Sequence, residues 1–378
     1  MKIPVILDTD IGSDIDDTWA LGLLLKSPEV DLRLAVSATG DTTYRARLLA
    51  KMLQTAGRSD VPVGVGLDTQ DESRRAFPQA AWVEGYDLAD YPGQVHMDGV
   101  GAMIEAILAS PQPVTVLGIG PLPNIAEALR REPRIALNAR FVGMHGSLRQ
   151  GYDGAADILA EYNVKLDPPA CRAAFSAPWD VTITPLDPCG LIRLEGEAYR
   201  RVRDSADPIA RMIIENYRLW LASNQVDWLK GVDAEAHSTV LFDTVAAYLT
   251  FSEELLEMEL LGVRVDGEGV VGLGGGRGGL SPPRPRRQGH PLRHRLERPA
   301  CLRTPAGRAP DWRMSEAHPS WEVLSTGCPY RWKTNPLCTR SAPPTPCPRS
   351  RAGEKIILEN VCTVHRTHIP QTPPLRKP

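Results

Sequence analysis

The sequence predicts an α/β fold in which an open, mostly parallel sheet carries helices on both faces, followed by a disordered C-terminal tail. Short apolar segments typical of buried strands alternate with amphipathic helical segments along most of the chain. Strands joined through helices run parallel to one another. The composition then changes sharply after about residue 269. We therefore expect one α/β domain over residues 1–269 and a Pro/Arg-rich tail over residues 270–378.

The expected elements follow from apolar runs and their end signals. Residues 3–8 are a short apolar run that ends in acids, as expected for a buried strand. Further strands are expected at residues 32–38, 62–66, 114–119, 139–144, 181–185 and 256–265. Helices are expected at residues 16–27, 42–57, 95–110, 122–131, 167–176, 195–222 and 243–251. Acids in a first turn, Gly57 at a helix end and Pro168 near a first turn support these assignments.

The segment between residues 66 and 91 has no clear period and is long for a plain loop. Loops of this kind often cover binding sites. Trp82, Tyr86 and Tyr91 are therefore candidates for contact with a planar ligand. The alternative is that these aromatic side chains only hold the loop against the body of the domain.

Composition excludes several classes of protein. No apolar run approaches the roughly 20 residues that a membrane span requires. The N-terminal segment lacks the apolar core and cleavage site of a signal peptide, so we expect a cytoplasmic protein without a membrane partner. The seven cysteines form no paired CxxC site, and a reducing compartment would keep them as thiols. We expect neither a disulfide framework nor a zinc site.

The predicted tail differs from the rest of the chain in charge and proline content. Residues 271–378 contain 19 Lys and Arg, six Asp and Glu, and 18 of the 34 prolines, which leaves 24 basic and 40 acidic groups in residues 1–270. Scarce aliphatic residues and prolines without a period predict disorder. We interpret the tail as a frameshifted or mispredicted gene end. The alternative is a basic segment that binds nucleic acid.

The densest chemical signal lies at the end of the first expected strand. Five acids stand within ten residues there, namely Asp8, Asp10, Asp14, Asp16 and Asp17. Ligands of open α/β sheets bind at this edge. Crowded carboxylates repel one another unless protons or a cation compensate, and a hard cation such as calcium takes roughly six to eight oxygen ligands. The alternative is a solvated acidic loop with an Asp as helix cap. A DxD pattern after a first strand also opens phosphatases of the haloacid-dehalogenase type.

This acidic segment, DTDIGSDIDDTWAL at residues 8–21, resembles the opening signature of the inosine–uridine preferring nucleoside hydrolases. The family writes the signature as DxDPGxDD or in a form with two extra residues. Six further segments resemble family motifs in the same order, and we identify them as AVSATGD (35–41), VTVLGIGPLPNIAEAL (114–129), FVGMHG (141–146), AEYNVKLDPPA (160–170), DVTITPLD (180–187) and VLFDTVAAYL (240–249).

The resemblance implies hydrolysis of the N-glycosidic bond between ribose and a nucleobase, with one bound calcium ion. It implies that Asp10 ligates the ion and is the general base for the attacking water. Asp17, the backbone carbonyl of Ile119 and Asp243 would be the other protein ligands. Such a bond breaks towards an oxocarbenium-like sugar, so nearby negative charge helps, and a bound cation lowers the pKa of water.

The resemblance also assigns the groups around the sugar. Asp16, Asp41, Glu161 and Asn163 would contact ribose hydroxyls, and Asp8 would support the other carboxylates. For Asn163 the alternative is an amide that only stabilises its loop. The implied partner is a small-molecule ribonucleoside rather than a nucleic acid, in purine and pyrimidine salvage. The implied assembly is a homodimer or homotetramer.

Several positions depart from the family pattern. Asp41 stands where the best-known members have an Asn that contacts the sugar, and a carboxylate accepts hydrogen bonds but does not donate them. Phe242 stands where many members have a His that protonates the leaving base. Asp14 has no counterpart, His145 is a candidate for the cleft wall, and His237 is either near the site or a surface residue. These departures keep a second hypothesis open, that of a catalytically silent protein that binds nucleosides or ribose.

Overall fold

The computed structural model describes residues 1–70, 77–223, 229–273 and the strand at residues 300–305. They all belong to the first of two units of the chain, Met1–Cys328. The second unit, Pro329–Pro378, lies outside the described residues, as do residues 274–299 and 306–328. Among the described residues, no helix has both the length and the apolar character needed to cross a bilayer.

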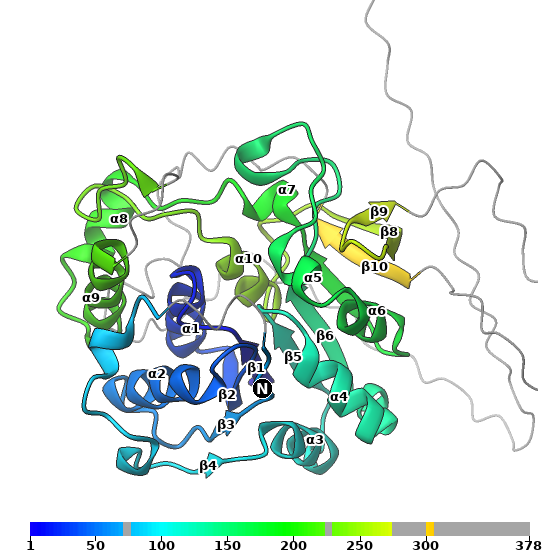
Figure 1. Cartoon of the computed structure of the whole chain (residues 1–378), viewed down its shortest axis with the longest axis horizontal. Coiled ribbons are helices and arrows are strands. Elements are labelled where there is room, and N and C mark those ends of the chain that lie inside the picture. Colours follow the sequence, from blue (N-terminus) through cyan, green and yellow to red (C-terminus); the bar gives the residue numbers. More distant parts are fainter. Residues whose placement is uncertain (71–76, 224–228, 274–299, 306–378) are drawn as a thin grey trace, which may run out of the picture. The chain divides into compact units, whose positions relative to one another are not determined.

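A single sheet forms the centre of the described unit, with the strand order β4-β3-β2-β1-β5-β6-β7-β10-β8-β9 (Figure 1). The first seven strands of the chain pair only in parallel. They are β1 (Ile3–Thr9), β2 (Val30–Ser37), β3 (Val63–Val65), β4 (Val95–His96), β5 (Val114–Gly118), β6 (Ala139–Met144) and β7 (Val181–Thr184). The predicted α/β class with a mostly parallel sheet is therefore confirmed.

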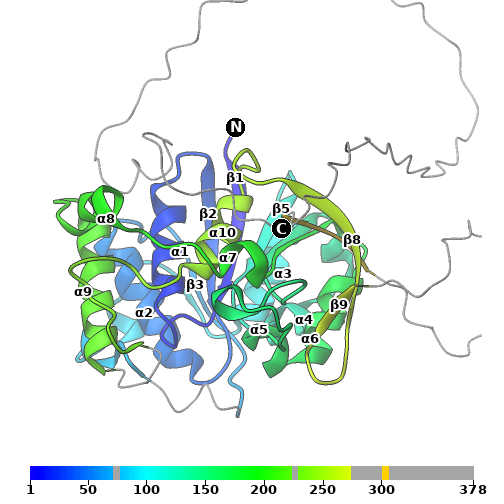
Figure 2. The ribbon, with the colours of Figure 1, turned by 90° about the horizontal axis from the view of Figure 1, so that it is seen from above.

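Helices connect these strands and cover the sheet. The α-helices are α1 (Asp16–Lys26), α2 (Thr42–Thr55), α3 (Gly99–Ala109), α4 (Pro123–Arg131), α5 (Tyr162–Leu166), α6 (Pro168–Ser176), α7 (Leu186–Cys189), α8 (Gly196–Arg203), α9 (Pro208–Ser223) and α10 (Phe242–Leu249). Short 3₁₀ helices are η2 (Ala80–Val83), η3 (Leu88–Asp90), η4 (Pro133–Leu137) and η5 (Tyr152–Gly154). Figure 2 shows α8 and α9 beside α1 and α2, at the opposite end of the view from strands β8 and β9.

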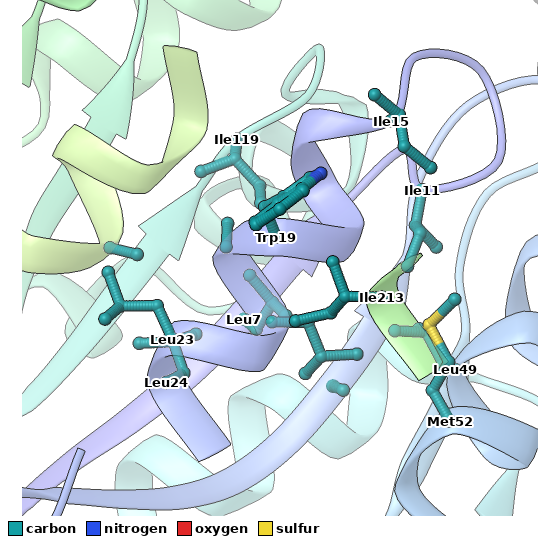
Figure 3. Packing of buried hydrophobic residues seen from close by; sticks show 14 of the residues in the cluster. Leu7, Ile11, Ile15, Trp19, Leu23, Leu24, Leu49, Met52, Ile119 and Ile213 are labelled. Carbon is teal, nitrogen blue, oxygen red and sulfur yellow. The ribbon is translucent and has the colours of Figure 1, made fainter. Parts of the chain in front are cut away.

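Two apolar layers form because consecutive residues of the central strands point to opposite faces. In β1, Val5 and Leu7 pack into one layer, and Ile6 packs into the other. The first layer contains the buried faces of α1, α2, α9 and α10. Ile213 of α9 lies against Gly22 of α1, and Figure 3 shows Ile213 below Trp19. The second layer contains the buried faces of α3, α4 and α6. The helices thereby fix the two faces of the sheet and leave its carboxyl edge for the site.

Some short elements differ from the sequence-based expectation. The helix expected at residues 95–110 is the short strand β4 followed by α3, which begins after Asp98 caps the backbone N–H of Gly101. The helical stretch expected at residues 195–222 is divided into α8 and α9. The elements α5 and α7 were not predicted, because four or five residues carry too little periodic pattern.

The aromatic residues of the segment between residues 66 and 91 hold it against the domain. Trp82 and Tyr91 are buried, and the Trp82 ring lies 4.8 Å from the Lys51 ammonium of α2. The Tyr91 hydroxyl donates to the Val61 carbonyl at 2.6 Å, and the Tyr86 hydroxyl donates to Gln54 at 2.7 Å. These contacts favour an anchoring role over contact with a ligand.

Three further strands lie at one edge of the sheet. Strand β8 (Met258–Val265) pairs antiparallel with β9 (Val271–Leu273) and with β10 (Ala300–Pro305), and β10 pairs in parallel with β7. Both β9 and β10 lie beyond residue 269, within the region predicted as the tail. The origin proposed for the tail stays a prediction, and most of that region lies outside the described residues.

Candidate active site at the carboxyl edge of the sheet

The parallel pairing of the strands brings the acidic segment together with the ends of its neighbours. In the register of the sheet, Asp8 of β1 lies opposite Val36 of β2 and Gly118 of β5. The backbone N–H of Ile119, just after β5, donates to the Asp8 carbonyl at 3.0 Å. The acids that follow β1 therefore lie at the carboxyl edge, where the sequence places them.

A group of three buried carboxylates forms where α1 packs against α10. One carboxylate oxygen from each of Asp16, Asp17 and Asp243 lies within 4.8 Å of the others. The Asp243 N–H donates to Asp16 Oδ2 at 3.3 Å, across 227 positions of sequence. All three residues are at most 4% exposed. The group contains two of the expected metal ligands, Asp17 and Asp243, together with Asp16, which was expected to contact ribose.

Burial makes this group electrostatically costly in the absence of a cation. Loss of solvation raises the pKa of Asp16, Asp17 and Asp243 well above the usual range, and the negative charges of their neighbours raise each pKa further. A set of oxygen donors at this spacing suits a hard cation, because such an ion replaces the lost solvation and removes the mutual repulsion. The three residues therefore fit a metal site.

Asp10 lies beside this group but outside it. The carboxylate is 4% exposed, and its charge raises the pKa of Asp16, Asp17 and Asp243. A Cβ built on Gly120 would lie 2.6 Å from Asp10 Oδ1, so only glycine allows the backbone after β5 to approach the carboxylate this closely. Ile119, the expected carbonyl ligand, is the preceding residue. The predicted set of Asp10, Asp17, Ile119 and Asp243 thus converges on one edge of the sheet.

A threonine at the end of β1 orients Asp17. The Thr9 hydroxyl donates to Asp17 Oδ1 and accepts from the Ile11 N–H at 3.1 Å. Thr9 is completely buried. The hydrogen bond fixes the orientation of the Asp17 carboxylate.

Arg45 of α2 holds the backbone of the acidic segment. Its guanidinium donates to the carbonyls of Thr39 at 2.8 Å, Ile11 at 2.9 Å and Asp10. The side chain is 1% exposed, and its charge lowers the pKa of Asp17. Thr39 has a φ of 60°, an unfavourable conformation for a β-branched residue. Arg45 was not predicted as a site residue, although it precedes Leu49 by four residues and Met52 by seven and so lies on the apolar face of the helix.

Asp8 is held from the opposite side by Asn124 of α4. The Asn124 amide donates to Asp8 Oδ1 at 2.7 Å and to the Ser37 carbonyl at 3.0 Å, and its oxygen accepts from the Leu67 N–H at 2.8 Å. Burial raises the pKa of Asp8 to about 7. Asp8 therefore supports the edge through Asn124, which links β1, β2 and the segment after β3.

Glu161 caps α5 and Asn163 lies within it, and both side chains contact the backbone at the ends of β5 and β6. The Glu161 carboxylate accepts from the N–H groups of Asn163 at 2.7 Å, Gly146 at 3.0 Å and Val164 at 3.3 Å. Burial raises the pKa of Glu161 to about 7. The Asn163 amide donates to the carbonyls of Met144 at 3.1 Å and Ile119 at 3.2 Å. Glu161 thus fixes the chain around Asn163, and Asn163 contacts the same carbonyl that was expected to ligate the metal.

Asp41 and Asp14 have local partners. Asp41 Oδ1 accepts from the Tyr44 N–H at 3.0 Å and caps α2. Asp14 Oδ1 accepts from the Ile15 N–H at 2.6 Å, and burial raises the pKa of Asp14 to about 6.

The rings of the two candidate histidines have backbone partners: His145 Nε2 lies 3.1 Å from the Gly120 carbonyl, and His237 Nδ1 lies 2.8 Å from the Ser238 carbonyl. His145 is completely buried, with its ring centroid 5.8 Å from those of Phe141 and Phe175 in the second apolar layer. Burial lowers the pKa of His145 to about 4, so its ring is neutral near pH 7. The backbone of His237 forms a β-bridge with Glu195 and accepts from the Tyr217 hydroxyl at 3.1 Å.

Known ribonucleoside hydrolases match most of this chain. The family model described as inosine-uridine preferring nucleoside hydrolase covers residues 5–285. The pyrimidine-specific ribonucleoside hydrolase RihA of Salmonella arizonae is 29% identical over 283 residues, which are 72% of this chain and 89% of that protein. The non-specific ribonucleoside hydrolase RihC of Klebsiella pneumoniae is 32% identical over 196 residues, or 50% of this chain and 62% of that protein.

Solved structures share the fold. The plant nucleoside hydrolase PpNRh1 has a TM-score of 0.66 at 19% identity, with 86% of this chain and 98% of that chain covered. The inosine-uridine preferring nucleoside hydrolase of Bacillus anthracis has a TM-score of 0.60 at 16% identity, with the same coverage.

The fold and the site define an α/β protein with a buried cluster of carboxylates, fit to hold a metal ion, at the carboxyl edge of a parallel sheet. The match over residues 5–285 then shows that the chain belongs to the inosine-uridine preferring nucleoside hydrolase family, which confirms the predicted resemblance. The match extends past residue 269, the boundary predicted from composition.

The contacts of Arg45 predict a large effect on stability. Replacing it in Arg45→Met removes the donor from three buried carbonyls, and we expect the free energy of unfolding to fall by about 3 kcal/mol or more. Arg33→Met is the matched control, because Arg33 is exposed and pairs only with Asp31, and it should change stability by less than about 1 kcal/mol. Denaturant unfolding measures both variants. Equal small losses would show that Arg45 does not hold the acidic segment.

Proposed function

We propose that this protein hydrolyses the N-glycosidic bond of ribonucleosides to ribose and free base, with a calcium-activated water. The observation that carries the proposal is the group of Asp16, Asp17 and Asp243 next to Asp10, in a member of the nucleoside hydrolase family. A bound calcium ion would lower the pKa of a water molecule and polarise it for attack.

The proposed ligands of the ion are oxygen atoms of Asp10, Asp17, Ile119 and Asp243. Three carboxylates and one backbone carbonyl form a hard, irregular donor set, which calcium accepts more readily than magnesium. Asp16 lies within the three-carboxylate group and is proposed to serve the ion or a ribose hydroxyl.

Asp10 is proposed as the general base. Its carboxylate lies at the same edge as the candidate ligands, and a base must reach the proton that it removes. The surrounding negative charge also stabilises the positive charge that develops on the sugar as the C–N bond breaks. The pKa values of the neighbouring carboxyls are raised by burial, so the charged state that favours the reaction depends on the bound cation.

Asn163, Glu161, Asp16 and Asp41 are proposed to bind the ribose hydroxyls. The Asn163 amide nitrogen is engaged by two carbonyls, which directs the amide oxygen to serve as an acceptor. Glu161 receives three N–H groups but retains lone pairs for a further donor. Asp41 is proposed to contribute a carboxylate oxygen from the N-cap position of α2, where one of its oxygens caps the helix.

The second candidate is a catalytically silent protein that binds nucleosides or ribose. Phe242 favours it, because a phenyl ring carries no proton for the departing base. The finer properties implied by the resemblance are also proposals: a cytoplasmic enzyme of nucleoside salvage, acting on free nucleosides as a homodimer or homotetramer.

Sugar release tests the reaction directly. We expect the protein with calcium to release reducing sugar from at least one of inosine, uridine and adenosine, and we expect Asp10→Asn to lower kcat by at least about 100-fold through loss of the base. Asp31→Asn, on the surface at a partly exposed ion pair, is the control and should retain full activity. The silent-binder hypothesis would replace ours if calcium and nucleoside bind but no nucleoside in the panel is cleaved.

Calorimetry tests the ion. Asp17→Asn and Asp243→Asn should each weaken calcium binding at least tenfold, whereas Asp31→Asn should leave it unchanged. Because burial raises the pKa of Asp16, Asp17 and Asp243, protons compete with the ion, and calcium affinity should fall as the pH is lowered from 7.5 to about 6. Unchanged affinity in both variants would contradict the ligand assignment.

A further inference from the structure

Two aromatic side chains lie beside the candidate metal site. Phe242 is the first residue of α10 and directly precedes Asp243. The ring of Tyr152, in η5, meets the Phe242 ring edge to face, with centroids 6.0 Å apart and planes at 83°. Both side chains are only partly buried. An aromatic pair next to a cluster of carboxylates suits a ligand with a polar sugar and a planar base.

The Tyr152 hydroxyl contacts the chain next to Glu161. It accepts from the N–H of Tyr162 at 3.1 Å, and Tyr162 directly follows Glu161. The charges of Glu161 and Asp14 both act on the phenol. The hydroxyl is therefore within the electrostatic reach of the site, although Tyr152 belongs to a separate turn after β6.

The hydroxyl of Tyr152 has an unused donor. Within the described part of the chain it accepts one hydrogen bond and donates none. Two other candidate donors have backbone partners of their own: His145 Nε2 lies 3.1 Å from the Gly120 carbonyl, and His237 Nδ1 lies 2.8 Å from the Ser238 carbonyl. Phe242, which faces Tyr152, has no proton to offer.

We propose that Tyr152 is a catalytic residue whose hydroxyl donates a hydrogen bond to the departing nucleobase. The inference rests on the proposed function. In the reaction, the water oxygen bonds to the sugar carbon and one water proton goes to Asp10. The electron pair of the broken C–N bond goes to the base, which Tyr152 stabilises until the base takes a proton from solvent. Asp10 returns its proton to solvent, so the products are ribose and neutral base.

The electrostatics of the site agree with a donor that keeps its own proton. Burial and the charge of Glu161 raise the pKa of Tyr152 above its usual value. A phenol in this environment stays protonated across the neutral range. It therefore supplies a hydrogen bond to developing negative charge rather than a transferred proton.

A purely structural role for Tyr152 makes a different prediction. The same hydroxyl accepts the Tyr162 N–H and could act only by holding α5 and Glu161 in place. Loss of that contact would disturb the sugar site and slow every substrate equally. Loss of a donor to the base would slow only those substrates whose leaving group needs the donor.

Two substrates separate these roles in Tyr152→Phe, which keeps the ring against Phe242. For the nucleoside that the wild type cleaves fastest, we expect kcat/KM to fall at least tenfold. For p-nitrophenyl β-D-ribofuranoside, whose leaving group is already a stable anion, we expect a change of less than threefold. Retained cleavage of this riboside also shows that the variant is folded. Tyr86→Phe, which loses a hydroxyl bonded to Gln54, is the control and should match the wild type on both substrates.

The remaining outcomes overturn the inference in distinguishable ways. An equal loss on both substrates would assign Tyr152 a positioning role through Tyr162. An unchanged kcat/KM for the nucleoside would remove Tyr152 from the reaction. Failure of the wild type to cleave either substrate would overturn the proposed function itself, and this inference with it.

Discussion

The rest of the structure depends on one electrostatic constraint, the burial of many carboxylates at a single edge of the sheet. Asp8, Asp10, Asp16, Asp17, Glu161 and Asp243 are each at most 4% exposed. Isolated charges in such surroundings are strongly disfavoured, so the edge must hold protons or a cation. Arg45 brings a buried positive charge, but its hydrogen bonds go to backbone carbonyls. The carboxylates themselves therefore need protons or an ion, and the geometry of Asp16, Asp17 and Asp243 suits an ion.

The scaffold around the carboxylates is built from neutral and cationic groups that orient carboxylate side chains and fix backbone. Thr9 orients Asp17, Asn124 ties Asp8 to β2, and Arg45 joins the turn after β1 to the turn after β2. Each contact links segments that the parallel sheet has already brought side by side. The site is thus preorganised by the strand ends, and the apolar layers on both faces keep those ends in register.

The sequence predicts the α/β alternation well, because long apolar runs and amphipathic helices carry strong local patterns. It also predicts the acidic edge, because five acids follow one buried strand. The pairing of Asp243 with Asp16 depends on the packing of α10 against α1 and has no local signal. His145 illustrates the same limit: its position after β6 suggested the cleft, but its ring contacts with Phe141 and Phe175 and its contact with the Gly120 carbonyl depend on packing between distant segments. Arg45 and Tyr152 were missed because their roles arise only from contacts between distant segments.

The most direct test is a crystal structure determined with calcium, with the ion located by its anomalous scattering. We predict one ion bound by carboxylate oxygens of Asp17 and Asp243 at about 2.3–2.6 Å, with Asp10 and the Ile119 carbonyl completing the protein ligands. A carboxyl edge that stays free of metal at saturating calcium, or an ion bound away from Asp17 and Asp243, would contradict this account.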